Sequence, residues 1–243
     1  MAVRHQIGVL SRVASAFLIP DNHLGRATVS SVAVAHEVDQ MGGRSIACLN
    51  ARDRNLLGFR RDLMTAAAYG VDEFLLVFGD SPSAGTRAGG LTVRAMLEEL
   101  RRFSEAAGPP GAPGALALRA GVTSRLAPLP AWKHEADFVF VQASFDVDAL
   151  LRWRESVDVD AKVYAGVLVP PSGSRARKWA TEIPEISVPD AWIAALDKDP
   201  TAGVELACEL VEAIGDSRAF DGVHLVPGVR YRQVAARLEE MAK

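Results

Sequence analysis

Short apolar runs that end in polar residues are the feature of this sequence that most restricts its fold. The clearest run, Phe74–Phe78, passes directly into Gly79 and Asp80. An unbroken apolar run of this length is typical of a strand buried on both faces, as in a parallel sheet covered by helices. The pattern therefore predicts that Asp80 lies at the carboxyl end of a buried strand.

Seven runs of this kind are predicted strands, and helical patterns separate them. In the separating segments, apolar residues recur every three or four positions, as in 56–67, which Gly70 closes, and in 93–103 and 206–214. Strands that alternate with helices imply a parallel α/β sheet, because parallel neighbours need a crossover connection. The predicted strands are Ala16–Ile19, Arg44–Leu49, Phe74–Phe78, Ala115–Val122, Phe138–Gln142, Lys162–Val169 and Gly222–Val226.

Composition restricts the class of protein and its partners. The 243 residues suit one α/β domain, and we expect a single domain over 1–243. A net charge of -3 without a basic run argues against nucleic acid as a partner. Arg4 and Arg12 interrupt the apolar start, so we expect a soluble cytoplasmic protein, without a membrane partner, as a monomer or small homo-oligomer. Cys48 and Cys208 have no metal-ligand spacing, and no metal site is predicted.

Polar side chains follow the predicted strands, where parallel sheets bind their ligands. Their hydrogen-bonding groups suit a flat heteroaromatic ligand better than a phosphate. Neither of the two common glycine-rich phosphate-binding motifs is present. The strand ends carry Asp21-Asn22, Asn50 with Ala51–Asn55, Gly79-Asp80, Thr123-Ser124, Gln142 with Ala143–Asp146, Pro170-Pro171 and Pro227.

Five segments, in the same order, resemble methylenetetrahydrofolate reductases. The longest is ACLNARDRNLLGFRRDLMTAAAYGVDEFLLVFGD, which ends in the Gly-Asp pair at Asp80. The other four are EADFVFVQASFDVDALLRW (Glu135–Trp153), GVLVPPS (Gly166–Ser172), VPDAW (Val188–Trp192) and GVHLVPGVRYRQVAARL (Gly222–Leu238). The resemblance extends from about Phe17 over nearly the whole chain.

The resemblance implies a TIM-type (β/α)8 barrel that reduces 5,10-methylenetetrahydrofolate to 5-methyltetrahydrofolate with NADH or NADPH. Asp80 then corresponds to the catalytic aspartate, which also contacts substrate, and Gln142 to the glutamine that hydrogen-bonds the pterin. A carboxylate and a carboxamide together can satisfy the donors and acceptors of a pterin edge without a metal. Phe145 and Trp192 lie in segments that the resemblance places near the tetrahydrofolate substrate. Cofactor contacts are expected from Cys48, Asn50 and Arg52.

Departures from the family pattern bear on the cofactor and on the acid. No strand with the family's N-terminal glutamate is present, so either the barrel lacks its first strand or the start of the sequence lies downstream of the true one. Cys48 and Phe78 stand where flavoprotein members have a histidine and an arginine, and 119–130 lacks their histidine pattern. These replacements disfavour FAD and favour direct hydride transfer from the nicotinamide.

Each assignment has an alternative. Asp80 could be a turn or helix-capping residue, and Gln142 a buried polar residue satisfied by the backbone. Asp53 could cap the helix predicted over 55–69 and pair with neighbouring arginines, whereas Arg52 or Arg54 could face a folate tail or a cofactor phosphate. For the whole chain, the alternatives to a reductase are a folate-binding homologue or subunit without reductase activity, and a one-carbon enzyme that partners a methyltransferase.

Overall fold

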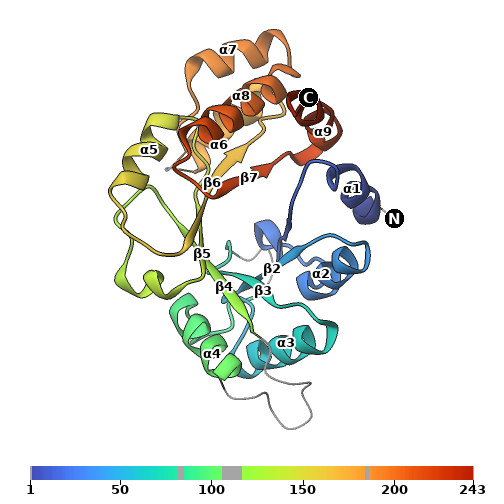
Figure 1. Ribbon diagram of the computed structural model, residues 1–243, viewed down its shortest axis with the longest axis vertical. Helices are drawn as coiled ribbons and strands as arrows, with labels where there is room; N and C mark the ends of the chain where they lie inside the picture. The colour runs from blue at the N-terminus through green and yellow to red at the C-terminus, as the bar shows by residue number, and fades with distance from the viewer. Residues whose placement is uncertain (1, 82–84, 106–116, 184–185, 243) are drawn as a thin grey trace. The chain divides into compact units, whose positions relative to one another are not determined.

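The computed structural model describes residues 2–81, 85–105, 117–183 and 186–242 (Figure 1). It is an α/β structure whose strands pair in parallel with their neighbours within each of two compact units. The first unit comprises Met1–Ile7, Ala14–Thr123 and Ala131–Asp137, and the second comprises Gly8–Val13, Ser124–Pro130 and Phe138–Lys243. The parallel α/β class predicted from the sequence is confirmed.

In the first unit, strands that are neighbours in sequence are also neighbours in the sheet. Phe17 pairs with Ser45, and Leu75 pairs with Cys48 on one side and Gly121 on the other. Helix α1 (Ala2–Leu10) precedes the strands. The strands are β1 (Phe17–Ile19), β2 (Ser45–Asn50), β3 (Glu73–Val77) and β4 (Arg119–Ser124), and the other helices are η1 (His23–Gly25), α2 (Ser31–Gln40), α3 (Leu56–Tyr69), α4 (Val93–Glu105) and η2 (Ala131–Glu135).

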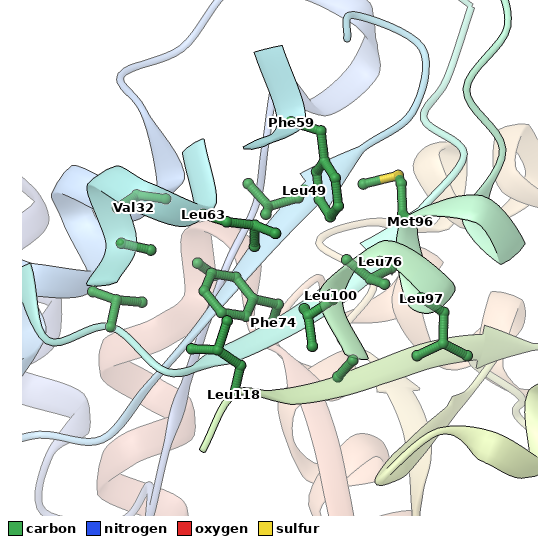
Figure 2. Packing of buried hydrophobic residues seen from close by; sticks show 14 of the residues in the cluster. Val32, Leu49, Phe59, Leu63, Phe74, Leu76, Met96, Leu97, Leu100 and Leu118 are labelled. Atoms are coloured by element: carbon green, nitrogen blue, oxygen red, sulfur yellow. The ribbon is translucent and has the colours of Figure 1, made fainter. Parts of the chain in front are cut away.

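The core of the first unit lies between the sheet and helices α2, α3 and α4 (Figure 2). Phe59 and Leu63 on α3 meet Phe74 and Leu76 on β3, and all four are completely buried. Each such side chain contributes about 1.5–3 kcal/mol by leaving water. Because strand residues alternate between faces, this packing leaves Cys48 on the face of β2 opposite the helices.

The second unit repeats the pattern with three strands. Phe140 pairs with Tyr164, and Tyr164 pairs with Gly222, so the three strands run parallel in chain order. Asp146 and Ser172 cap two of the helices, since their side chains accept hydrogen bonds from the first-turn amides. The elements are β5 (Phe138–Val141), α5 (Val147–Glu155), β6 (Lys162–Leu168), α6 (Gly173–Glu182), α7 (Asp190–Lys198), α8 (Ala202–Ser217), β7 (Gly222–Val226), η3 (Gly228–Arg230) and α9 (Tyr231–Met241).

Six of the seven predicted strands need boundary corrections, most of them by one residue, and one capping alternative is wrong. Strand β3 begins one residue early, at Glu73, whose buried carboxylate is paired with Arg44 and Arg119. The strand predicted over 115–122 corresponds to β4, which begins four residues later, at Arg119, and ends two residues later, at Ser124. Residues 115–116 lie outside the described residues. Asp53 does not cap α3, because the side chain of Asn55 accepts the hydrogen bond from the Gly58 amide instead.

Two other sequence expectations concern helix ends and membranes. Gly70 follows α3 with a left-handed φ of 74°, and its role as the residue that closes the helix is confirmed. Within the described ranges, we find no helix that combines the length and the apolar character needed to cross a bilayer.

Candidate functional site

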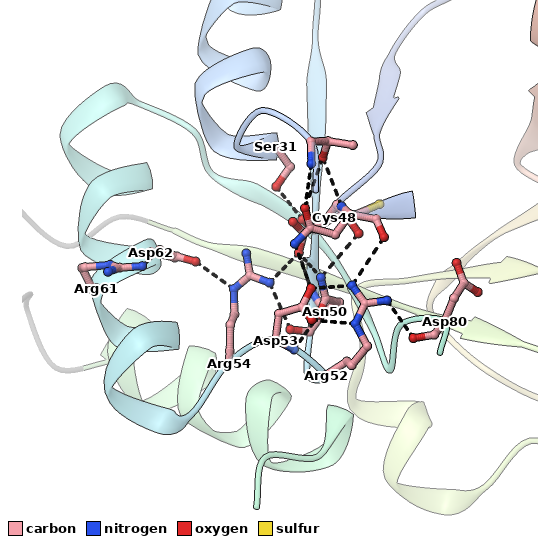
Figure 3. A network of polar contacts seen from close by, with 12 residues as sticks. Ser31, Cys48, Asn50, Arg52, Asp53, Arg54, Arg61, Asp62 and Asp80 are labelled. Carbon is pink, nitrogen blue, oxygen red and sulfur yellow. Dashed lines mark hydrogen bonds and ion pairs between the residues drawn. The ribbon is translucent and has the colours of Figure 1, made fainter. Parts of the chain in front are cut away.

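The carboxyl ends of β1, β2 and β3 are joined by a network of polar side chains (Figure 3). Asp21 follows β1, Asn50 ends β2, and Asp80 follows β3. The Asp21 carboxylate accepts hydrogen bonds from the Asn50 backbone amide at 2.9 Å and from its side-chain amide at 2.6 Å. The ends of β1 and β2 are therefore tied directly to each other.

Arg52 is the most buried charged group of this network. Its side chain is only 1% exposed and forms an ion pair with Asp53. The guanidinium also donates to the carbonyl oxygen of Asp80 at 2.7 Å and to that of Asn22 at 3.4 Å. Arg52 therefore forms the local ion pair that was one of the two roles considered from the sequence. Its donors point at protein acceptors rather than outward to a cofactor phosphate.

Asn50, the second residue assigned to a cofactor, is also engaged within the network. It is fully buried, and its side-chain oxygen accepts from the Asp53 amide at 2.9 Å. Arg54 donates to the Asn50 carbonyl at 3.0 Å and pairs with Asp21 and Asp62. The Asn50 side chain thus bonds the loop after β2 through its oxygen and Asp21, beyond the end of β1, through its nitrogen.

Asp80 keeps an exposed side chain at the end of β3. One carboxylate oxygen accepts a 2.8 Å hydrogen bond from the backbone amide of Leu24 in η1. The other oxygen accepts nothing from the residues that the structure describes. Asp80 does not cap the next helix, since α4 begins at Val93. An acceptor oxygen is therefore available to a ligand at this strand end.

Gly79 lets the Asp80 loop approach β2 closely. Its φ is 90°, in the left-handed region that favours glycine, and an added Cβ would lie 3.1 Å from the Cβ of Asn50 and 3.2 Å from that of Arg52. Packing therefore requires glycine at position 79.

Electrostatics in the first unit follow from these contacts. The hydrogen bond from Arg52, more than any other contact, holds the pKa of Asp53 well below its usual range. Burial, with a smaller effect from Asp21, raises the pKa of the Cys48 thiol to about 12. Cys48 is only 7% exposed, so it behaves as a small neutral apolar group at this point of the sheet.

In the second unit, Gln142 lies just beyond the end of β5. Its backbone amide donates to the Ser124 carbonyl at 2.7 Å, and the residue is half-buried. Among the described residues, none forms a hydrogen bond with the side-chain amide of Gln142. The described contacts therefore do not include the backbone partner that the alternative for Gln142 requires.

Phe145 and Trp192 touch each other. Their ring centroids are 4.9 Å apart and the rings are inclined by 77°, an edge-to-face arrangement. Phe145 is 6% exposed and belongs to an apolar cluster with Val188 and Leu196, whereas Trp192 is half-buried against that cluster. Phe145 is a core residue that supports Trp192, and Trp192 retains some surface for contact with a ligand.

The Leu24 amide that binds Asp80 has no signature in the sequence, because every residue except proline has a backbone amide. In the second unit, the ring of His224 on β7 lies 5.2 Å from that of Phe140, nearly perpendicular to it. Burial lowers the pKa of His224 to about 4, so this imidazole is neutral near pH 7. Because side chains alternate between the two faces of a strand, His224 can be assigned to a face of the sheet from its position along β7.

No protein-family model matches the chain, and no curated protein matches it. Among solved structures, an uncharacterized protein from Clostridium thermocellum matches with a TM-score of 0.65 and 13% identity, over 99% of this chain and 87% of that chain. That protein is described as binding two copies of 5-methyl-5,6,7,8-tetrahydrofolic acid. The two proteins share a fold. A tryptophan synthase complex from Pyrococcus furiosus matches with a TM-score of 0.43 and 13% identity, over 88% of this chain and 92% of that chain.

Proposed function

We propose that this chain binds a reduced folate and, as a methylenetetrahydrofolate reductase-like enzyme, reduces 5,10-methylenetetrahydrofolate to 5-methyltetrahydrofolate with NADH or NADPH. The sequence resemblance supports this proposal and extends it to a (β/α) barrel fold for residues 1–243. The Clostridium thermocellum protein supports it independently, because the ligand described for that protein is the product of this reaction.

The observation that carries folate binding is the side-chain amide of Gln142. It is half-buried just beyond a strand end, without a hydrogen-bond partner among the described residues. Because this amide is bonded to no described protein group, its donor and acceptor are free to pair with a ligand. The edge of a pterin offers the donors and acceptors that a carboxamide complements. Trp192 adds partly exposed aromatic surface in the same unit.

Asp80 is the proposed catalytic group. Its second carboxylate oxygen can accept from the donor edge of a pterin. Its negative charge would favour the cation that develops as the methylene bridge opens to an iminium ion. The Leu24 amide fixes the orientation of the carboxylate, which favours electrostatic stabilisation over proton donation by Asp80.

The residues that would meet a flavin do not fit one. Cys48 is buried with a protonated thiol, and the half-exposed ring of Phe78 is covered by the Arg87 guanidinium at 4.8 Å. The polar groups of Asn50 and Arg52 form hydrogen bonds with other protein groups. We therefore propose direct hydride transfer from the nicotinamide of NADH or NADPH to the folate, without FAD.

A folate-binding protein without reductase activity is the second candidate. The description of the Clostridium thermocellum protein favours it, because that description states folate binding and no reaction.

Two measurements on the purified protein separate these functions. The first is calorimetric titration with 5-methyltetrahydrofolate, and the second is anaerobic mixing with methylenetetrahydrofolate and NADH or NADPH, followed by nicotinamide absorbance. Binding together with loss of absorbance supports the reductase. Binding with a flat absorbance trace supports the second candidate, and the absence of both effects contradicts folate chemistry altogether.

A further inference from the structure

Gly166 on β6 lies directly beside the backbone that carries Gln142. A Cβ added at Gly166 would lie 2.5 Å from the Val141 carbonyl oxygen, 2.8 Å from the Ala143 nitrogen and 2.9 Å from the Ala143 Cα. All three contacts are with main-chain atoms, so no rotation of a side chain could relieve them. The segment from 141 to 143 occupies the space that any other residue at 166 would need.

The requirement for glycine at this position is steric. Gly166 does not belong to the glycines with positive φ, so its backbone conformation is open to other residues. Its neighbours in the strand, Ala165 and Val167, are fully buried on the opposite face. Because Gly166 has no side chain, the segment after β5 can lie close to β6.

Hydrogen bonds hold that segment on both sides. The Gln142 amide donates to the Ser124 carbonyl at the end of β4 at 2.7 Å. Two residues later, the Ser144 amide donates to the Gly166 carbonyl at 3.2 Å. Gln142 is thus fixed between the end of β4 and β6, with its backbone packed against Gly166.

We infer that Gly166 is a positioning residue for Gln142, because it lets the segment 141–143 seat against β6 and so directs the Gln142 amide at a bound reduced folate. This role rests on the proposed folate binding. A Cβ at position 166 must push the segment away from β6, since contacts under 3.0 Å essentially never occur. Misplacement of a contacting group by about 1 Å can cost about 100-fold in a tuned site.

The test is a double-mutant cycle between Gly166→Ala and Gln142→Ala, read as affinity for 5-methyltetrahydrofolate by calorimetry. Gly166→Ala should weaken binding by about 10- to 100-fold in the parent, but by less than about 3-fold when Gln142 is already alanine. Gly222→Ala on β7 is the matched control, because its Cβ would meet only the Tyr164 ring, at 3.2 Å. It should change affinity by less than about 3-fold.

A second variant covers the case in which Gly166→Ala does not fold. Ala143→Gly adds no atoms and loosens the same segment, so it should weaken binding by about 3- to 10-fold in the parent and have no effect with Gln142→Ala. Parent-like affinity in the folded Gly166→Ala protein, or an equal loss in both backgrounds, would overturn the positioning role alone. A parent that does not bind 5-methyltetrahydrofolate would overturn the proposed function, and the positioning role with it.

Discussion

The Nη1 atom of Arg52 donates a 2.7 Å hydrogen bond to the backbone carbonyl oxygen of Asp80. This bond joins the loop after β2 to the loop after β3, and the Leu24 amide reaches the same aspartate from η1. The shape of the Asp80 loop is therefore set by a buried side chain of a neighbouring strand end. Removal of that side chain should affect stability and site geometry together.

Arg52→Lys should lower the free energy of unfolding by about 1–3 kcal/mol, because an ammonium cannot reproduce the fork that holds Asp53 and the Asp80 carbonyl. Urea unfolding measures the loss. Arg61→Lys is the control, since Arg61 is 77% exposed and its replacement should cost less than about 0.5 kcal/mol. Equal losses in the two variants would show that the Arg52 contacts do not contribute.

Asp80→Asn retains the shape of the side chain and removes its charge. It should reduce reductase turnover by about 10- to 1,000-fold, which corresponds to about 1.4–4 kcal/mol in the barrier. The melting temperature should change little, because a neutral amide oxygen can still accept from Leu24. Asp216→Asn, at an exposed position on α8, is the control. Parent-like turnover in Asp80→Asn would remove Asp80 from the mechanism.

Gln142→Ala should weaken folate binding by about 1–3 kcal/mol, the scale of a lost partner for a buried polar group. The melting temperature should change far less than the affinity, since the Gln142 side chain has no partner among the described residues. Calorimetric titration and thermal unfolding of the same preparation separate the two effects. An unchanged affinity with a lower melting temperature would assign Gln142 a structural role.

His224 should make the free energy of unfolding depend on pH. Burial lowers its pKa to about 4 in the folded protein, whereas an unfolded histidine titrates near about 6.5. Between these values the unfolded chain binds more protons, so stability falls as the pH drops from about 6.5 to 4, by at most about 3 kcal/mol. His224→Gln should flatten this slope in urea unfolding, and an unchanged slope in this variant would contradict the prediction.

The purified protein should be colourless and should not take up FAD. Cys48 has a buried thiol and Phe78 an apolar ring, so neither side chain supplies the polar contact that flavoprotein relatives are expected to use at these positions. The visible spectrum after incubation with FAD and removal of the excess provides the measurement. A flavin spectrum near one equivalent per chain would contradict this prediction.

Much of the fold could be predicted from apolar periodicity alone. The apolar runs that form β3 and β5 are unbroken and buried on both faces, as expected for strands of a parallel sheet. The start of β3 could not be found this way, because Glu73 is buried only through its pairing with Arg44 and Arg119. Such pairing depends on strands that are distant in sequence.

The candidate site was less predictable, for a physical reason. Asp80 could be found because parallel strands present their carboxyl ends at one edge. Asp53 and Asn55 both have side chains suited to capping; Asn55 directly precedes α3 and caps it, whereas Asp53 pairs with Arg52. The steric role of Gly166 follows only after β5 and β6 have been placed side by side.

The strand-end network has a consequence for how its loops move. The amide hydrogens of Leu24, Asp53 and Ala88 all lie outside the strands, yet each is bonded to an acceptor on Asp80, Asn50 or Arg52. In deuterated solvent, such amides exchange only when their hydrogen bonds open. Because one connected network supplies the acceptors, these scattered loop positions should open as a single cooperative unit, at rates closer to those of the sheet than to those of surface turns.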